Sequence, residues 1–266
     1  MLTKLREEAG MTQDHAAQLM EWSDSRLSRV ENGQSKPDIH AVKSLLDIYD
    51  IVGPERADIE DLTREAKQPG WWKSYGTDDR GYVPLEDEAR VVSEYQTMLI
   101  PGLLQTKAYA RATFAESGLL RHRINNNVAV RMRRQERLTN DRPLQLNAII
   151  EEDVLLRPAD DHAMMHAQLD HLIEAVALPT VSLRVLPRSR GIHRGKEGAF
   201  IFLEYTDLED PDLIYVEHCA GSLVMEKPDE VEAGKVVFTD LSKVALSEED
   251  SLSLIRQVND EVWSVA

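Results

Sequence analysis

The sequence predicts a small all-α domain followed by a larger α+β domain with a mostly antiparallel sheet. Two observations support this prediction. The first third of the chain carries short apolar stripes at helical spacing, separated by residues that begin or end helices. After a break at Gln68-Pro69-Gly70, runs typical of strands and runs typical of helices both occur, but they do not alternate strictly. We therefore place an all-α helix-turn-helix domain at residues 1–67 and an α+β domain at residues 68–266.

The composition is that of a folded protein with a strong negative charge. Hydrophobic residues make up 42% and charged residues 29% of the 266 residues, and the formal net charge is −16. The sequence has no apolar stretch long enough to span a membrane and no apolar signal core near Met1, and Cys219 is the one cysteine. We therefore expect a cytoplasmic protein with neither an intramolecular disulfide nor a cysteine-rich zinc site.

The charge distribution restricts how this chain can bind nucleic acid. DNA phosphates are normally neutralised by an excess of Lys and Arg. Residues 1–67 hold nine basic and fourteen acidic side chains, so this segment is itself acidic. Binding to DNA therefore has to depend on the local arrangement of a few cations.

Five short helices are predicted within residues 1–67. The first ends at Gly10, the second begins after an N-cap at Thr12, and the third lies between Ser23 and Asn32-Gly33. A fourth runs from about Asp38 to Tyr49, and a fifth begins after Pro54. The residues expected to face their common core are Leu2, Leu5, Ala16, Ala17, Leu19, Met20, Leu27, Val30, Ile39, Val42, Leu45, Leu46, Tyr49, Ile59, Leu62 and Ala66.

The second and third helices form a candidate helix-turn-helix for the major groove of DNA. A turn of three to four residues separates them, and the small side chains of Ala16 and Ala17 allow a close helix crossing. With Leu27 and Val30 directed inward, the opposite face of the third helix bears short polar and arginine side chains that suit base edges and phosphates. This face has Ser25, Arg29 and Asn32 at its centre and Arg26 and Ser28 on its flanks.

This segment resembles the helix-turn-helix of the Xre and phage-repressor family. The matching residues are Thr12-Gln13, Ala17, Ser23, Leu27, Val30 and Glu31-Asn32-Gly33. The resemblance implies that Gln13 contacts the DNA backbone, that Lys36 lies near a phosphate, and that Arg6 and Glu31 form a buried ion pair. Together with the exposed helix face, it gives a DNA-binding set of Gln13, Ser23, Asp24, Ser25, Arg26, Ser28, Arg29, Asn32 and Lys36, in which Asp24, Ser25 and Arg29 face bases. Glu21 stands where the family favours glycine, so we expect a strained turn at a cost of about 1 kcal/mol.

The second domain is expected to contain four strands and four helices. The strands are predicted at Leu144–Ile150, Val181–Leu186, Ala199–Glu204 and Leu213–Glu217. The helices are predicted at about Asn127–Leu138, Asp160–Ala177, Pro228–Leu246 and Ser247–Val262. On the first of these helices Arg131, Arg133, Arg134 and Arg137 are expected on a solvated face, with a phosphate or partner role as the alternative.

Two groups of side chains in this domain are candidates for binding small ions. His162, His166 and His171 have a spacing that can bind metal, but no recognisable ligand set accompanies them, so we expect a solvated helix and no metal. The densest basic window of the chain contains Arg188, Arg190, His193, Arg194 and Lys196. Because it lies between two predicted strands, it is either an anion or partner site or an exposed loop.

The second domain resembles that of a group of actinomycete Xre regulators whose second domain has no assigned biochemical function. The matching segments are Trp71-Trp72, Glu94–Ala112, Arg133–Leu138, Leu178–Pro187, Gly191–Gly198, Asp212–His218 and Ala245–Ile255. Those regulators are described as antitoxin-like, and the resemblance implies a small partner protein encoded by an adjacent gene.

Together these features predict a sequence-specific transcription regulator that binds double-stranded DNA. It is expected to act as a homodimer, because one recognition helix, here near Ser23–Asn32, covers only a half-site. Its second domain would sense a ligand or bind the small partner. The alternative is an antitoxin-like interaction protein that sequesters this partner and binds DNA mainly for autoregulation. No nucleophile–base motif is present in the sequence, so we expect no enzymatic activity, no catalytic residue and no cofactor.

Overall fold

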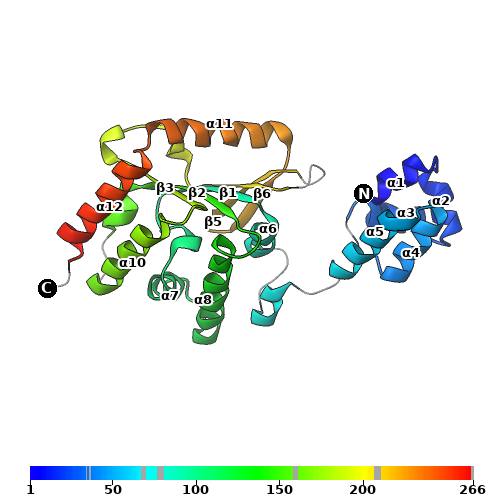
Figure 1. Cartoon of the computed structure of the whole chain (residues 1–266), viewed down its shortest axis with the longest axis horizontal. Helices are drawn as coiled ribbons and strands as arrows, with labels where there is room; N and C mark the ends of the chain where they lie inside the picture. The colour runs from blue at the N-terminus through cyan, green and yellow to red at the C-terminus, as the bar shows by residue number, and fades with distance from the viewer. Residues whose placement is uncertain are drawn as a thin grey trace. The chain divides into compact units, whose positions relative to one another are not determined.

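The computed structural model describes residues 1–33, 35, 37–66, 70–76, 81–157, 161–206 and 211–264. The chain divides into two compact units, Met1–Trp71 and Trp72–Ala266 (Figure 1). We call the first unit the head and the second unit the body, and describe each by itself. Among the described residues, no helix has the length and apolar character needed to cross a membrane.

The head is all-α, as the sequence predicts. Its helices are α1 (Leu2–Glu8), α2 (Gln13–Leu19), α3 (Asp24–Glu31), α4 (Ile39–Ile48) and α5 (Gly53–Glu65). The hydroxyl of Thr12 caps α2 by accepting from the N–H of His15, and the carboxylate of Asp38 caps α4 by accepting from the N–H of His40. The predicted helix stops are confirmed, because the backbone is left-handed at Gly10 (φ 70°) and Gly33 (φ 68°).

The core of the head draws on all five helices. Its fully buried members are Leu5, Ala16, Ala17, Leu27, Val42, Leu45, Leu46, Tyr49 and Ile59. The prediction was wrong for Leu19, which is 51% exposed, because this residue lies about 110° around the helix from the middle of the Ala16 and Ala17 face. It was also wrong for Leu62 and Ala66, which are exposed because the core reaches along α5 only as far as Ile59.

The body contains one mixed six-stranded sheet in the order β3-β2-β1-β4-β5-β6. Its strands are β1 (Val91–Gln96), β2 (Gln145–Glu151), β3 (Val181–Leu186), β4 (Phe200–Glu204), β5 (Leu213–His218) and β6 (Gly221–Met225). Strands β1, β2 and β3 are parallel, whereas the pairings of β1 with β4, β4 with β5 and β5 with β6 are antiparallel. The predicted α+β class with a mostly antiparallel sheet is therefore confirmed. The four predicted strands are present, while β1 and β6 were missed because Glu94 interrupts the apolar run of one and Gly221-Ser222 opens the other.

Helices cover both faces of the sheet (Figure 1). One face is covered by α11 (Pro228–Val244). The opposite face carries the larger core, together with α6 (Tyr82–Glu88), α7 (Lys107–Ala115), α8 (Arg121–Gln135), α9 (Glu152–Leu156), α10 (His162–Ala175) and α12 (Glu248–Val262). The 3₁₀ segments are η1 (Trp71–Tyr75), η2 (Gly102–Leu104), η3 (Glu136–Leu138), η4 (Arg188–Arg190) and η5 (Arg194–Glu197). Helix α12 lies against β3 and blocks that edge of the sheet, where the N–H of Val185 donates to Oγ of Ser251 (2.9 Å).

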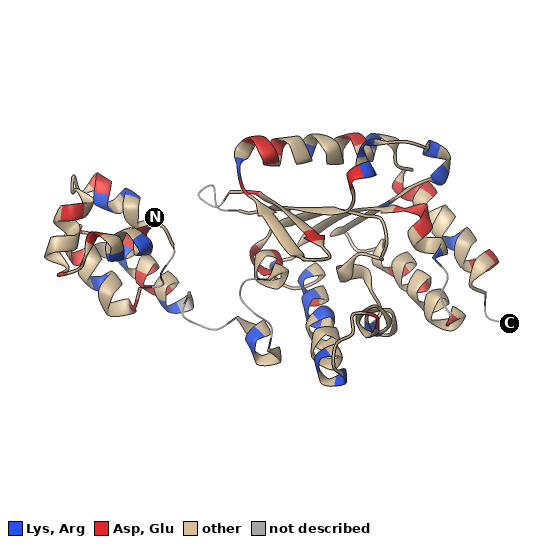
Figure 2. Cartoon of the chain, turned by 180° about the vertical axis from the view of Figure 1, so that it is seen from behind, with Lys and Arg blue, Asp and Glu red and all other residues tan. Residues whose placement is uncertain are grey.

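The prediction of a solvated face was wrong for Arg131 and Arg134 of α8 and for Arg137 of η3, whereas Arg133 is exposed. Figure 2 shows the basic residues along α8. Arg134 is buried and donates from Nε and Nη2 to the two carboxylate oxygens of Glu86 (2.6 and 2.7 Å). Arg131 donates to Oε1 of Gln105 (2.7 Å), and Arg137 donates to the backbone carbonyl of Ala89 (3.0 Å). The end of α8 packs against η2 and α6, so these guanidinium groups find carbonyl and carboxylate partners instead of water.

A fragment of residues 1–67 is expected to fold alone, because every fully buried member of the head core lies between Leu5 and Ile59. Circular dichroism of this fragment should show a cooperative helical melt. A gradual, non-cooperative loss of signal would contradict the domain boundary and show that the head depends on the body.

Candidate nucleic-acid interface

The turn between α2 and α3 has the geometry of a tight helix-turn-helix. Glu21 adopts a left-handed backbone (φ 55°), as expected at the position where the family favours glycine. The N–H of Trp22 donates to the carbonyl of Ala17 (2.8 Å), and the N–H of Glu21 donates to the carbonyl of Gln18 (3.0 Å). These bonds close α2 and direct the chain into α3. Ser23 occupies the N-cap position of α3, but its side chain makes no capping hydrogen bond.

A buried carboxylate at the end of α3 ties the first three helices together. Nε of Arg6 in α1 lies 2.7 Å from Oε1 of Glu31, whose side chain is 1% exposed. Nε2 of Gln13 in α2 donates to the other carboxylate oxygen (2.7 Å), and Nη1 of Arg6 donates to the carbonyl of Met11 (2.8 Å). The hydrogen bond to Glu31 raises the pKa of Arg6 above its ordinary value. The ion pair implied by the resemblance is therefore confirmed.

The structure gives Gln13 an internal partner that the sequence did not reveal. Its side-chain amide is half-buried and bonded to Glu31, so it positions α2 against α3. The expected contact between Gln13 and the DNA backbone stays a prediction.

The outer face of α3 is open to solvent along its length. Its exposed residues are Ser23, Asp24, Ser25, Arg26, Arg29 and Asn32 at the end of the helix. Ser28 is half-buried, and its Oγ accepts from Nδ2 of Asn32 (3.2 Å). The guanidinium of Arg26 stacks over the ring of Trp22 (4.1 Å to the centroid), which holds its charge beside the turn. Lys36, the expected phosphate contact, lies outside the described residues.

The cations of the head divide into paired and unpaired groups. The side chains of Arg6, Lys43, Arg56 and Arg64 form ion pairs with carboxylates of the head. Within the described part of the chain, neither Arg26 nor Arg29 has an ion-pair partner. Since these two lie on the open face of α3, the cations still able to bind an anion include two on the predicted recognition helix.

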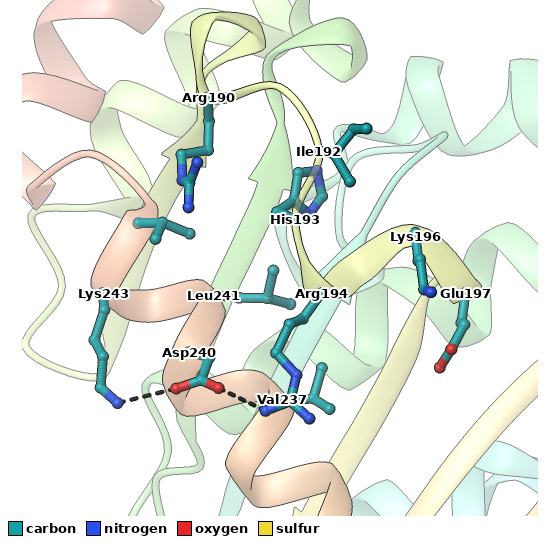
Figure 3. Close-up of a pocket in the computed structure, with 11 residues that line it drawn as sticks. Arg190, Ile192, His193, Arg194, Lys196, Glu197, Val237, Asp240, Leu241 and Lys243 are labelled. Carbon is teal, nitrogen blue, oxygen red and sulfur yellow. Dashed lines mark hydrogen bonds and ion pairs between the residues drawn. The ribbon is translucent and has the colours of Figure 1, made fainter.

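A second group of cations lies in the body, around a cavity of about 670 Å³ (Figure 3). The cavity is bounded by the loop of residues 187–199 and the second half of α11. It is lined by Arg190, Ile192, His193, Arg194, Lys196, Glu197, Val237, Asp240, Leu241, Lys243 and Val244. Four of the five residues predicted as an anion or partner site therefore lie together, and α11 adds the cation Lys243.

The fifth predicted residue, Arg188, is not among the lining residues. Its guanidinium is bonded to Asp153, and its backbone N–H donates to Oε2 of Glu152 (2.8 Å). Because its charge is already paired, Arg188 anchors the start of the loop to α9, and its part in an anion or partner site stays a prediction.

Two side chains beneath this loop, Tyr95 and Glu151, were not among the predicted site residues. The hydroxyl of Tyr95 donates to Glu151, and Nε2 of His193 lies 3.2 Å from the same carboxylate. Burial and this carboxylate raise the pKa of Tyr95 well above its ordinary value. Tyr95, Glu151 and His193 come from three distant parts of the chain. Only the parallel pairing of β1 with β2 brings Tyr95 and Glu151 together.

The histidines of α10 do not gather into a metal site. His166 lies near Asp170, with 3.6 Å between Nε2 and Oδ2, and His162 packs edge-on against the ring of Trp263. Among the described residues, no group of three or more His, Cys, Asp or Glu side chains is arranged to hold a metal ion.

Comparison with known families assigns both units. Residues 79–257 match the family described as a domain of unknown function, DUF5753, which is more than half of the chain. This chain belongs to the DUF5753 family. Residues 1–59 match a helix-turn-helix domain, which agrees with the geometry of α2 and α3. No curated protein and no solved structure matches the chain significantly.

The Glu31→Ala substitution is expected to destabilise the head by about 3–5 kcal/mol, because it leaves Arg6 buried without its carboxylate. Hydrogen–deuterium exchange of the α1–α3 amides in the full chain measures this loss of unfolding free energy. The matched control is Glu7→Ala, since Glu7 is exposed and lies 3.7 Å from the same arginine. Equal, small effects of both substitutions would contradict the central role of Glu31.

Proposed function

We propose that this DUF5753 protein is a sequence-specific transcription regulator of the Xre type that binds double-stranded DNA with α3 in the major groove. The observation that carries this proposal is the open face of α3, where Arg26 and Arg29 remain unpaired in an otherwise acidic head. The match of residues 1–59 to a helix-turn-helix domain supports it. In this proposal the protein is not an enzyme and needs no cofactor.

Each side chain of the open face has a distinct role in this proposal. Arg29 is placed to donate two hydrogen bonds to guanine, and Ser25 and Asn32 approach neighbouring base edges. Asp24, in the first turn, can accept from a cytosine amino group. Arg26, held by its stacking on Trp22, is suited to a phosphate beside the turn.

We further propose that the body senses a ligand or binds a small partner protein. An antitoxin-like protein that sequesters this partner, and uses DNA binding only for autoregulation, is the alternative. The acidic charge of the head favours this alternative, because weak DNA binding suffices for autoregulation. The regulator and the antitoxin-like alternative differ in one expected result. Only the regulator should bind genomic DNA fragments selectively as a purified chain without a partner.

The Arg29→Ala substitution is expected to weaken binding to the selected operator by about 1–3 kcal/mol and to change binding to random DNA little. The reason is that this side chain reads a base. Lys36→Ala should instead weaken binding to the operator and to random DNA equally. It should also make the slope of log affinity against log salt concentration shallower by about one unit per subunit. Fluorescence anisotropy across a salt series measures both effects.

The matched control for Arg29→Ala is Arg64→Ala, which removes the same charge from an ion-paired site on α5. This control should leave both kinds of binding close to wild type. If Arg29→Ala lowers affinity for every sequence equally, α3 does not read bases at this position. If the full chain binds no DNA even at low salt, the partner-binding alternative takes the place of this proposal.

A homodimer is part of the proposed function, since one α3 covers only a half-site. We propose the outer edge of β6 as the contact between two copies. This strand, Gly221–Met225, contains no charged residue or proline, and Leu223 and Val224 are 51% and 41% exposed. Among the described strands none pairs with its outer edge, whereas the β3 edge is blocked by α12. Unprotected edges of this kind pair with other strands, and an antiparallel pair of identical strands is compatible with a twofold axis.

The Leu223→Lys substitution is expected to convert the dimer into a monomer, because two like positive charges would meet at the strand pairing and repel each other. Sedimentation velocity of the full chain measures this change. The control Val262→Lys places the same charge on an exposed apolar residue of α12 and should leave the dimer intact. A dimer that survives Leu223→Lys would place the contact elsewhere.

A further inference from the structure

The cavity between the loop and α11 lies where α/β proteins place ligand sites. Strands β1, β2 and β3 are parallel and end at Gln96, Glu151 and Leu186. The loop of residues 187–199 follows the end of β3 and crosses over Tyr95 and Glu151. Ligands of open parallel sheets bind outside the carboxyl ends of the strands, where the loops leave space between layers.

The loop is held in place from below. Gly195 is buried so closely over Tyr95 that a Cβ at residue 195 would lie 2.6 Å from the tyrosine ring and hydroxyl. Nδ1 of His193 accepts from the N–H of Gly195 (3.2 Å), so Nε2 carries the ring proton and donates it toward Glu151. Both nitrogens of His193 are therefore used within the protein. The histidine positions the loop, while the neighbouring cations face the cavity.

The charges around the cavity favour an anion. Four cations line it, against the two carboxylates Asp240 and Glu197. Asp240 binds both Arg194 (2.7 Å) and Lys243 (2.9 Å), as the dashed lines in Figure 3 show. In the described part of the chain, neither the guanidinium of Arg190 nor the ammonium of Lys196 has a hydrogen-bond or ion-pair partner. In a chain with a net charge of −16, this leaves two cations unneutralised at one cavity and two more sharing one carboxylate.

The cavity also offers apolar surface. Val237, Leu241 and Val244 of α11 line it from one side. Ile192 lies at its rim and is 92% exposed. A ligand that fits both features therefore carries an anionic group and an apolar portion.

We propose that this cavity binds a small organic phosphate, with the phosphate held by the unpaired loop cations Arg190 and Lys196 and the apolar portion against α11. Phosphate is favoured over carboxylate because it carries more negative charge and three acceptor oxygens, which suit two unpaired cations better than a single carboxylate does. The role of the cavity as the sensing site rests on the regulator proposed above, whereas the binding itself does not.

Isothermal titration calorimetry of the full chain with phenyl phosphate, inorganic phosphate and phenol tests the proposal. Phenyl phosphate should bind at least about tenfold more tightly than inorganic phosphate, because part of its ring leaves water against α11. Phenol, which lacks the charge, should not bind measurably. Absence of phenyl phosphate binding at millimolar concentration would overturn the proposal.

Three variants locate the binding. Lys196→Gln should weaken phenyl phosphate binding about three- to fivefold, and Asp240→Asn should strengthen it by a similar factor, because Arg194 and Lys243 lose their competing carboxylate. The control Lys227→Gln makes the same charge change at the opposite end of α11 and should leave the affinity unchanged. Equal weakening by Lys196→Gln and Lys227→Gln would show a general charge effect and overturn the site.

A separate measurement with DNA distinguishes a failure of this proposal from a failure of the proposed function. The calorimetry contains no DNA, so a chain that binds phenyl phosphate but no operator contradicts the regulator and leaves the cavity assigned. The contrary outcome is a DNA duplex that competes with phenyl phosphate and also binds the Lys196→Gln variant more weakly than the wild type. In that case the cations bind the DNA backbone, and the small-ligand proposal is overturned.

Discussion

The carboxylate of Glu31 is the constraint on which the arrangement of the head depends. It accepts hydrogen bonds from Arg6 of α1 and Gln13 of α2, and it belongs to α3 itself. A buried charge of this kind is tolerated only when its partners are in place, because an unpaired carboxylate away from water is costly. Forming the pair therefore requires the three helices to pack in one geometry. That geometry turns Leu27 and Val30 inward and leaves Arg29 on the open face of α3.

The body depends on a similar pair, in which Arg134 of α8 binds Glu86 of α6. Beside it, burial raises the pKa of Glu94 to about 7, although the hydrogen bond from Gln96 acts in the opposite direction. Folding thus raises this pKa above the ordinary value of 4.5. The contribution of Glu94 to stability is complete below that value and is lost as the pH rises through about 7. The neighbouring charge of Arg134 limits this loss by favouring the ionised form.

The head could be predicted from sequence far better than the body, and the reason is the range of the interactions. Helix stops, caps and the left-handed residue Glu21 depend on neighbours within a few positions, and these features were predicted. Leu19 was placed wrongly even so, because a count of apolar residues ignores the angle around a short helix. The strand β1 was missed because its buried Glu94 is polar, and only α6 and α8 explain why a carboxylate is buried there.

The candidate sites follow the same rule. The exposed residues of α3 were found because helical periodicity alone selects them. In the body, the basic window around Arg190 was visible in the sequence. The sequence did not show that Arg188 anchors the loop while the other basic residues of the window line a cavity. Arg188 is neutralised by Asp153, 35 positions away, and Asp240 and Lys243 approach the loop from α11. Sequence distance hides such pairs, since many other carboxylates in an acidic chain could equally have been the partner.

Internal pairing also explains how a strongly acidic protein can offer cationic sites. The electrostatic field far from the molecule is set by the net charge and repels anions, but within a few ångströms the nearest unpaired side chains dominate, because salt screens charges beyond about 8–10 Å. In the head, carboxylates neutralise the cations of α4 and α5 and leave Arg26 and Arg29 unpaired on α3. In the body, Asp153 and Asp240 neutralise part of the loop and leave Arg190 and Lys196. The acidic residues therefore act selectively: by pairing with some of the cations and not with others, they favour anion binding at the surfaces where unpaired cations remain.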